Sequence, residues 1–263
     1  MMLPRCLNRT SRTLRTAVMA GVAAVALSAC ATSPTTTGSI TTPDFSAGSA
    51  TQLRGAIAQL GDQYKRNPGD RTTILYYSAA LRANGQSEQA IAVLEDGMTR
   101  YKSDPAMKIA YAKALVTGGR LDQALNVLDA AIDPRAPDWN ALSVKGAILD
   151  QQGRHAEART IYLQALKIAP EQASLHANLG LSYSMTNELD AAEKELRIAV
   201  SLRGANSKVR QNLALVVGLQ GRFDEARTLF AAELPPEGVE ANMSYIRTLL
   251  TQKNRWALIK ADG

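Results

Sequence analysis

Apolar side chains recur every three or four residues over most of this chain, which is the spacing that predicts amphipathic helices. Residues 139–170 show the pattern most clearly, as two helical stretches joined by a turn at Gly153 and closed by Pro170. Small residues lie where two packed helices must touch, at Gly146, Ala158 and Ala165. The stretch therefore predicts a pair of amphipathic helices packed back to back.

The same pair recurs with a period of about 34 residues, and four columns stay in phase. The first column is always alanine: Ala56, Ala90, Ala124, Ala158, Ala192 and Ala226. The turn column holds residue types that readily take a positive φ: Gly85, Gly119, Gly153, Asn187 and Gly221. A third column is always large and apolar: Leu60, Leu94, Leu128, Tyr162, Leu196 and Phe230. The fourth is always small: Ser78, Ala112, Gly146, Gly180 and Ala214.

On these columns the chain resembles the tetratricopeptide repeat family. The resemblance implies an all-α fold, a solenoid of helix-turn-helix repeats wound as a right-handed superhelix. An array is expected over residues 51–240, with a lone second helix followed by five repeats near 71–104, 105–138, 139–172, 173–206 and 207–240. Residues 241–263 are expected to close the array, because a terminal repeat needs a cover. The closing segment comprises a capping helix, Glu240 to Lys253, and a tail with Trp256, Leu258 and Ile259.

Residues 1–29 have the pattern of a secretory signal peptide. Four arginines precede an apolar run of 11 residues, Ala17 to Leu27, which is short for a membrane span. The sequence Leu27-Ser28-Ala29-Cys30 resembles the bacterial lipobox, in which the cysteine becomes the lipidated first residue of the mature chain. Residues 30–50, rich in Ser and Thr, predict a disordered tether. The alternative is an ordinary signal peptide with a chance cysteine after it.

The formal net charge of +6 overstates the basicity of the mature chain. Removing the signal segment, which has four arginines and no acid, lowers the charge from +6 to about +2, so nucleic-acid binding is not supported. The two cysteines, Cys6 and Cys30, both precede the repeats, and this excludes a disulfide or zinc framework within them.

The repeats carry no H-E-x-x-H, Gly-rich phosphate loop, C-x-x-C or G-x-S-x-G motif. His176 occupies the position where the repeat consensus has Trp, which predicts interhelical packing, and His155 at a turn is expected to be solvated. Acidic pairs such as Glu95-Asp96 are expected on solvated helix exteriors, and a change of charge on the outer face, such as Glu193→Lys, should be nearly silent. We therefore expect no enzyme activity, cofactor, metal or small-molecule substrate.

In tetratricopeptide proteins the first helix of each repeat lines a concave groove that holds a peptide or a partner helix. The repeat register assigns these residues to the groove: Leu75, Ala79, Arg82, Ile109, Lys113, Val116, Asn140, Ser143, Ala147, Asp150, Ala177, Leu181, Ser184, Lys208, Gln211 and Leu215. Charge is scattered among them, so mixed apolar and polar contacts are expected, centred on Ile109 and Val116 around Lys113. The alternative is that some apolar members pack between repeats.

The whole layout resembles the lipoprotein of the Tad/Flp pilus assembly system. The likeness rests on the lipobox, the tether, the half repeat with five repeats, and the stretch PPEGVEANMSYIR at 235–247. It implies a pilotin-like or scaffold role toward a secretin or other pilus-assembly components. Ala31 after Cys30 is not aspartate, which by resemblance to bacterial sorting rules implies an anchor in the outer membrane, facing the periplasm. An adaptor for peptidoglycan hydrolases and a general envelope-assembly lipoprotein are the alternatives.

Overall fold

The computed structural model describes residue 45 and residues 49–261, with side chains up to residue 252. Every long element in this part of the chain is a helix: α1 (Ala50–Arg66), α2 (Arg71–Ala83), α3 (Ser87–Arg100), α4 (Pro105–Thr117), α5 (Leu121–Asp129), α6 (Trp139–Gln151), α7 (His155–Ile168), α8 (Ala173–Met185), α9 (Leu189–Ser201), α10 (Ser207–Leu219), α11 (Phe223–Ala231) and α12 (Pro236–Ala261). The all-α fold predicted from the repeats is confirmed. The signal peptide, Cys30 and most of the tether lie outside the described residues.

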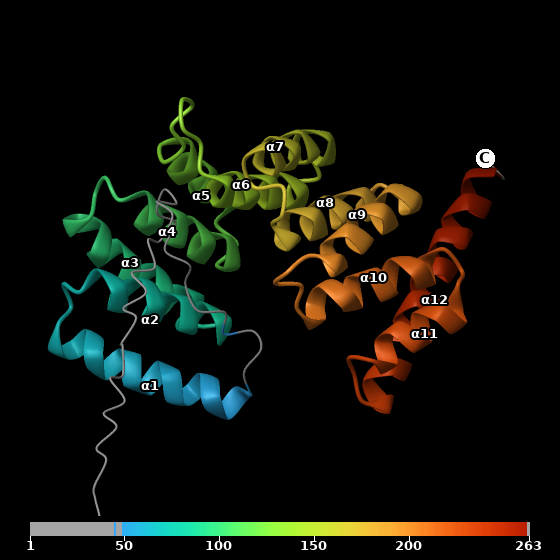
Figure 1. Ribbon diagram of the computed structural model, residues 1–263, viewed down its shortest axis with the longest axis horizontal. Helices are drawn as coiled ribbons and strands as arrows, with labels where there is room; N and C mark the ends of the chain where they lie inside the picture. The colour runs from blue at the N-terminus through green and yellow to red at the C-terminus, as the bar shows by residue number, and fades with distance from the viewer. Residues whose placement is uncertain (1–44, 46–48, 262–263) are drawn as a thin grey trace, which may run out of the picture. The chain divides into compact units, whose positions relative to one another are not determined.

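Each helix packs against the next, and alternate helices form a row of their own (Figure 1). Helices α2, α4, α6, α8 and α10 are the first helices of the five pairs, and each contacts the next member of this set directly. We call this set the first-helix row. Helix α1 packs on α2 at one end, and α12 packs on α10 and α11 at the other. The first-helix row therefore provides a continuous layer along the array.

Polar caps begin the first helices at the repeat period. Asp70, Asp104, Asp138 and Asn206 each precede a first helix and accept a hydrogen bond from a backbone N–H of its first turn. Each such cap stabilises its helix by about 1 kcal/mol, because it satisfies a donor that has no partner within the helix. These caps form a fifth column, which the apolar pattern alone does not reveal.

The turn column has the backbone conformation that its residue types predicted. Gly85, Gly119, Gly153 and Gly221 have φ values between 75° and 85°, and Asn187 has a φ of 64°. This left-handed conformation is easy for glycine and tolerable for asparagine. The column thus ends each first helix and reverses the chain into the second helix of the pair.

The small column allows close contact between the two helices of a pair. A Cβ atom built on Gly146 would lie 2.5 Å from the ring of Tyr162, and one on Gly180 would lie 2.8 Å from Cγ of Leu196. Neither position has space for a side chain. The packing role predicted for these glycines is confirmed by the space around them.

The apolar core is divided near the third repeat. A large buried cluster extends from Ile74 to Ile148, and a second extends from Ala177 to Ile246. Between them, α6, α7 and α8 contribute two smaller clusters around Tyr162 and Leu175. The third repeat therefore joins two larger apolar cores.

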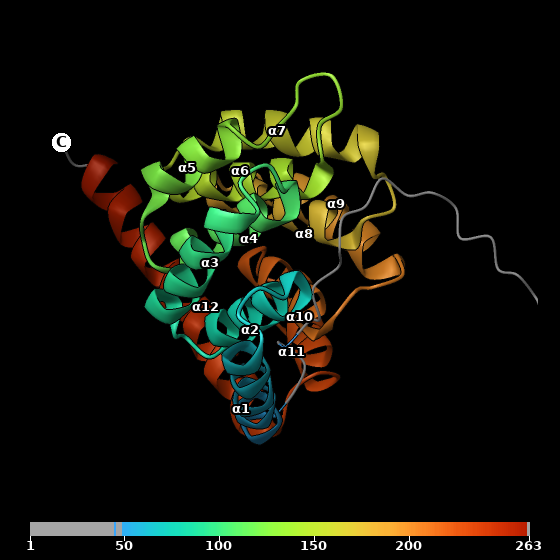
Figure 2. The ribbon, with the colours of Figure 1, turned by 90° about the vertical axis from the view of Figure 1, so that its left-hand side faces the viewer.

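Helix α5 is shorter than the second helix of the preceding pair, and proline is the reason. Helix α5 ends at Asp129, whereas α3 reaches Arg100, whose counterpart one repeat later is Pro134. Proline lacks an N–H and clashes with the preceding turn, so α5 cannot extend that far. The loop that replaces its last turn projects from the helix pairs (Figures 1 and 2).

The closing helix is longer than its prediction. It was expected over Glu240 to Lys253, but α12 begins at Pro236 and continues to Ala261. Proline is well suited to the first position of a helix, where no hydrogen bond from its nitrogen is required. Pro236 therefore starts the helix rather than marking a longer break. The side chains of Trp256, Leu258 and Ile259 lie outside the described part, so their packing stays a prediction.

Candidate functional site

The predicted groove residues fall into buried and more exposed sets. Six are buried: Leu75, Ala79, Ile109, Ser143, Asp150 and Ala177. Ten retain accessible surface: Arg82, Lys113, Val116, Asn140, Ala147, Leu181, Ser184, Lys208, Gln211 and Leu215. Leu75 and Ile109 are only 1% and 4% exposed, because neighbouring first helices pack directly on each other. The alternative that some apolar members pack between repeats holds for these two.

Lys113 joins two repeats across the first-helix row. Its Nζ donates a hydrogen bond to Oδ1 of Asn140, at 2.9 Å, from α4 to the first turn of α6. Both side chains are half-buried. Charges that looked scattered in the sequence are therefore brought together here, because Arg82 on α2 is close enough to repel the ammonium of Lys113.

Burial, and secondarily the repulsion by Arg82, lowers the pKa of Lys113 from 10.5 to about 8, while Asp138 acts in the opposite direction. A shift of this direction means that the ammonium form is poorly solvated in the folded protein. An anion placed beside Lys113 would relieve that deficit. The site is thus suited to an acidic group of a ligand.

The C-terminal part of the row adds apolar surface, mainly on α8. Leu181 and Leu215 are half-buried, and the side chain of Met185 at the end of α8 is 56% exposed. Methionine at a surface adapts its shape to apolar partners. The first-helix row is therefore cationic at α2 and α4 and more apolar at α8, while α10 adds Leu215 together with the exposed Lys208.

Asn178, which was not among the predicted groove residues, links the two parts of the row. Its Nδ2 donates to Oγ of Ser143 at 3.1 Å, from α8 to α6. The two positions are one repeat and one residue apart in sequence. Asn178 directly follows Ala177, a predicted groove position, so extending the groove set by one residue would have included it.

Asp150 was predicted to face the groove, but it lies in the interior with only 8% of its surface exposed. Its carboxylate accepts hydrogen bonds from Oγ of Ser182 at 2.8 Å and from the hydroxyl of Tyr162 at 3.1 Å. Burial, and then the carboxylate, raise the pKa of Tyr162, so the phenol stays protonated and donates. We call Asp150, Tyr162 and Ser182 the polar triad. It ties α6, α7 and α8 together.

His155 was expected to be solvated, and this is wrong. Its side chain is 23% exposed, and Nδ1 lies 2.9 Å from Oδ1 of Asp150. A buried carboxylate needs several donors, and the turn places this imidazole within reach. His176 packs between helices as predicted, because its ring nitrogens lie 2.7 Å from Glu195 Oε2 and 3.0 Å from the carbonyl of Pro170.

Within the described residues, no cluster of three or more His, Cys, Asp or Glu side chains is arranged to hold a metal ion. No helix in the same part of the chain is long and apolar enough to span a membrane.

Two family models, both described as tetratricopeptide repeat, match more than half of the chain. One matches residues 78–138, 109–173 and 145–208, and the other matches 210–232. The chain is 52% identical over 42 residues to the uncharacterized protein y4yS of Sinorhizobium fredii, covering 16% of this chain and 23% of that protein. It is 29% identical over 98 residues to human tetratricopeptide repeat protein 7A, covering 37% and 11%. The chain thus spans less than a quarter of either relative.

Solved structures share the fold. TTC0263, a tetratricopeptide repeat protein of Thermus thermophilus, matches with a TM-score of 0.59 and 23% identity over 70% of this chain and 99% of that chain. The Cut9–Hcn1 hetero-tetramer of the APC/C matches with a TM-score of 0.60 and 15% identity, over 79% of this chain and 40% of that one. Proteins with these repeats are generally non-catalytic and mediate protein–protein interaction or scaffolding. The chain belongs to the tetratricopeptide repeat family.

Proposed function

We propose that the first-helix row binds a segment of a protein partner, and that Lys113 is the centre of this site. The observation that carries the proposal is the half-buried ammonium of Lys113, which has Asn140 as a neutral hydrogen-bond partner and Arg82 as a second nearby cation. Keeping this arrangement costs stability in the free protein. A partner that supplies a carboxylate offsets that cost, so the arrangement favours binding.

The row also favours a bound segment that has an acidic group at one end and apolar side chains at the other. An acidic group of the segment lies at Lys113, and apolar side chains lie against Leu181 and Met185. Because α2, α4, α6 and α8 follow one another in a continuous layer, an extended peptide or a helix can contact both ends. The charge directs orientation, while apolar contacts supply most of the affinity.

We propose further that the chain acts as a non-enzymatic lipoprotein, anchored through Cys30 in the outer membrane and facing the periplasm. In this role it supports assembly of a Tad/Flp-type pilus secretion system, with a secretin or another assembly component as partner. The support is the order of lipobox, tether and repeats, together with the stretch at 235–247. A protein-binding array on a tether suits a scaffold of this kind.

A crosslinking pull-down from intact envelopes tests the site and the process together. Lys113→Met keeps the length of the side chain and removes its charge, so it should reduce recovery of the acidic partner severalfold. Lys194→Glu is the matched control, because Lys194 is exposed on α9 and outside the first-helix row. Circular dichroism on each variant confirms folding. Equal recovery with Lys113→Met would refute the site, and recovery of peptidoglycan hydrolases in place of pilus components would refute the process.

The anchor is tested separately by Cys30→Ser. Serine cannot form the thioether to diacylglycerol, so the variant should remain an unlipidated precursor. Metabolic labelling with palmitate measures this directly. The same label in both proteins would exclude Cys30 as the lipidated residue.

A further inference from the structure

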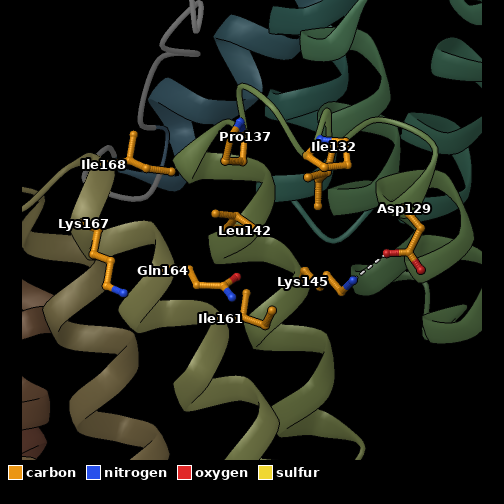
Figure 3. Close-up of a pocket in the computed structure, with 10 residues that line it drawn as sticks. Asp129, Ile132, Pro137, Leu142, Lys145, Ile161, Gln164, Lys167 and Ile168 are labelled. Carbon is orange, nitrogen blue, oxygen red and sulfur yellow. Dashed lines mark hydrogen bonds and ion pairs between the residues drawn. The ribbon is translucent and has the colours of Figure 1, made fainter.

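A pocket of about 570 Å³ lies between α6, α7 and the loop that joins α5 to α6 (Figure 3). It shares no residue with the predicted groove set. Its walls are mostly apolar: Ile132, Pro134, Pro137, Leu142, Ile161 and Ile168. This volume is within the range of pockets that bury a ligand or an inserted side chain.

The pocket exists because α5 is short. Helix α3 has 14 residues, whereas α5 has 9, so the last turn of a second helix is missing from the second repeat. Helix α11 is equally short, with 9 residues, but there Leu234 and Val239 pack into the core that follows. In the second repeat the corresponding space stays open. The two repeats thus differ in whether their own chain fills the gap.

The loop above the pocket is held in one conformation. The backbone N–H of Arg135 donates to Oδ1 of Asp133 at 2.8 Å, and that of Ala136 donates to the carbonyl of Asp133 at 3.2 Å. Pro134 and Pro137 fix two further φ angles. A wall that is already ordered loses little conformational entropy when a ligand binds.

The rim of the pocket carries one uncompensated cation. Lys145 forms an ion pair with Asp129 at 2.6 Å, so these two charges cancel (Figure 3). Gln164 and Lys167 on α7 also line the pocket, and within the described residues neither has a hydrogen bond or ion pair. A ligand can therefore find one free ammonium and one free amide at the mouth.

Apolar surface continues outside the pocket along α7. Leu163 is 47% exposed and Ile168 is 45% exposed, and they are two of the five most exposed large apolar side chains among the described residues. Leu163 lies one helical turn before Lys167, on the same face. A small molecule held in the pocket would leave Leu163 in water, whereas a peptide segment would cover it. A protein segment is therefore favoured over a small molecule, because it would cover the exposed side chain of Leu163 as well as fill the pocket.

We propose that this pocket binds a short segment of a second protein, which inserts one bulky apolar side chain and places a carboxylate against Lys167. The anchor side chain contacts Leu142 and Ile161 at the base, and flanking residues cover Leu163. Buried apolar anchors contribute most of the energy of such contacts, while exposed ion pairs contribute little. Loss of the anchor should therefore weaken binding more than loss of the acid.

The probe is the capped peptide acetyl-Gly-Phe-Leu-Asp-Glu-Gly-amide, titrated into the purified full chain with labelled Ile and Leu methyl groups and followed by NMR. Signals of Ile132, Ile161 and Ile168 should shift and saturate. A peptide with Ser in place of Phe and Leu should cause no shift, and one with Lys in place of Asp and Glu should bind a fewfold more weakly. Ile168→Glu should weaken binding about tenfold. The matched control, Tyr245→Glu, changes a side chain on α12 that is 55% exposed, against 45% for Ile168, and it should bind normally.

Several results would overturn the proposal. No shift at the three Ile signals would exclude the pocket, and shifts confined to Leu181 and Leu215 would assign the peptide to the first-helix row. Equal binding of the Ser peptide would exclude an anchor. A response to decanoate without one to the peptide would identify a site for a small amphiphile instead of a protein.

Discussion

Three apolar positions, two in the second repeat and one on the first helix of the third, have direct counterparts one period later, and the two sets have opposite chemistry. Val116, Leu128 and Ile148 are apolar members of the N-terminal core or pack against it. Their counterparts are Asp150, Tyr162 and Ser182, the buried and hydrogen-bonded polar triad. The same backbone arrangement therefore accommodates either an apolar contact or a polar network.

The apolar contacts and the polar triad constrain the packing of the helices to different degrees. Apolar burial is non-directional, so the second repeat tolerates small shifts between its helices. The polar triad requires fixed distances, so it specifies how α6, α7 and α8 pack. It is also less tolerant of loss, because removing one member leaves the others buried without a partner. The third repeat is the joint between the two large cores, which is where a fixed geometry matters most.

The largest effect is expected when one member of the polar triad is replaced alone. Asp150→Val introduces the residue type of the second repeat. It leaves the hydroxyls of Tyr162 and Ser182, and the imidazole of His155, without their acceptor. We expect a loss of about 2–4 kcal/mol of unfolding free energy. Urea unfolding followed by circular dichroism measures it.

Replacing the whole set provides the control. Asp150→Val, Tyr162→Leu and Ser182→Ile, combined with Gly146→Ala, reproduce the residues found one period earlier, where Ala112 and Leu128 are buried in the same core. Most of the lost stability should return, because the two buried hydroxyls are removed together with their acceptor, His155 is 23% exposed and can bind water instead, and the small column fits the smaller side chain. If the single variant is as stable as the natural protein, the triad contributes nothing to the joint.

A second test uses the small column alone. Gly146→Ala should destabilise by about 1–3 kcal/mol, because the new Cβ would lie 2.5 Å from the ring of Tyr162. Gly55→Ala is the matched control in α1, where a Cβ has nothing within 4 Å, so the better helix former should stabilise slightly. Thermal melting separates the two. A stabilising Gly146→Ala would contradict the close contact.

The repeat columns were sufficient to predict the helix pairs, the positive φ at the turns and the tight contacts at Gly146 and Gly180. They were not sufficient to separate surface from core on the first helices. Ile109 was expected at the centre of a groove, but the direct contact between first helices buries it. Changing it to Asp would therefore test folding and not binding.

The polar triad was missed because each member was considered within its own column. Asp150 had the register of a groove residue, and Tyr162 was one large side chain among leucines. The sequence does indicate the polar triad when the columns are compared with one another, because three of them change from apolar to polar within one period. Lys113 and Asn140 were missed as a pair for a related reason, since hydrogen bonds between repeats join positions that are not in the same column.

A third test concerns Lys113 on the surface of the second repeat. The equivalent position in the third repeat, 34 residues later, is Ala147. Lys113→Met should stabilise the protein by about 1–2 kcal/mol at pH 7, because a poorly solvated charge is removed. The folded pKa of about 8 is below the ordinary 10.5, so the unfolded state binds more protons between these values. The natural protein should therefore gain stability as pH rises from 8 to 10.5, and the advantage of the variant should shrink. An advantage that is independent of pH would contradict a buried charge.

The smallest effect is expected on the outer side of α9, and it corrects the expectation that Glu193 is a silent position. Only 15% of its side chain is exposed, and it accepts hydrogen bonds from Arg197 at 2.7 Å and from Arg222 of the next repeat at 2.8 Å. Burial opposes its charge, but the bonds from Arg222 and Arg197 prevail and lower the pKa of Glu193.

Glu193→Lys replaces that acceptor with a third cation between Arg197 and Arg222. We expect a loss below about 1 kcal/mol, since pairs near the surface are weak and screened. The neighbouring Lys194→Glu should change nothing, because Lys194 is exposed. Thermal melting at low and high salt measures both variants, and added salt should narrow the gap between Glu193→Lys and the natural protein. A gap that is the same at both salt concentrations would mean that packing, and not charge, makes this position sensitive.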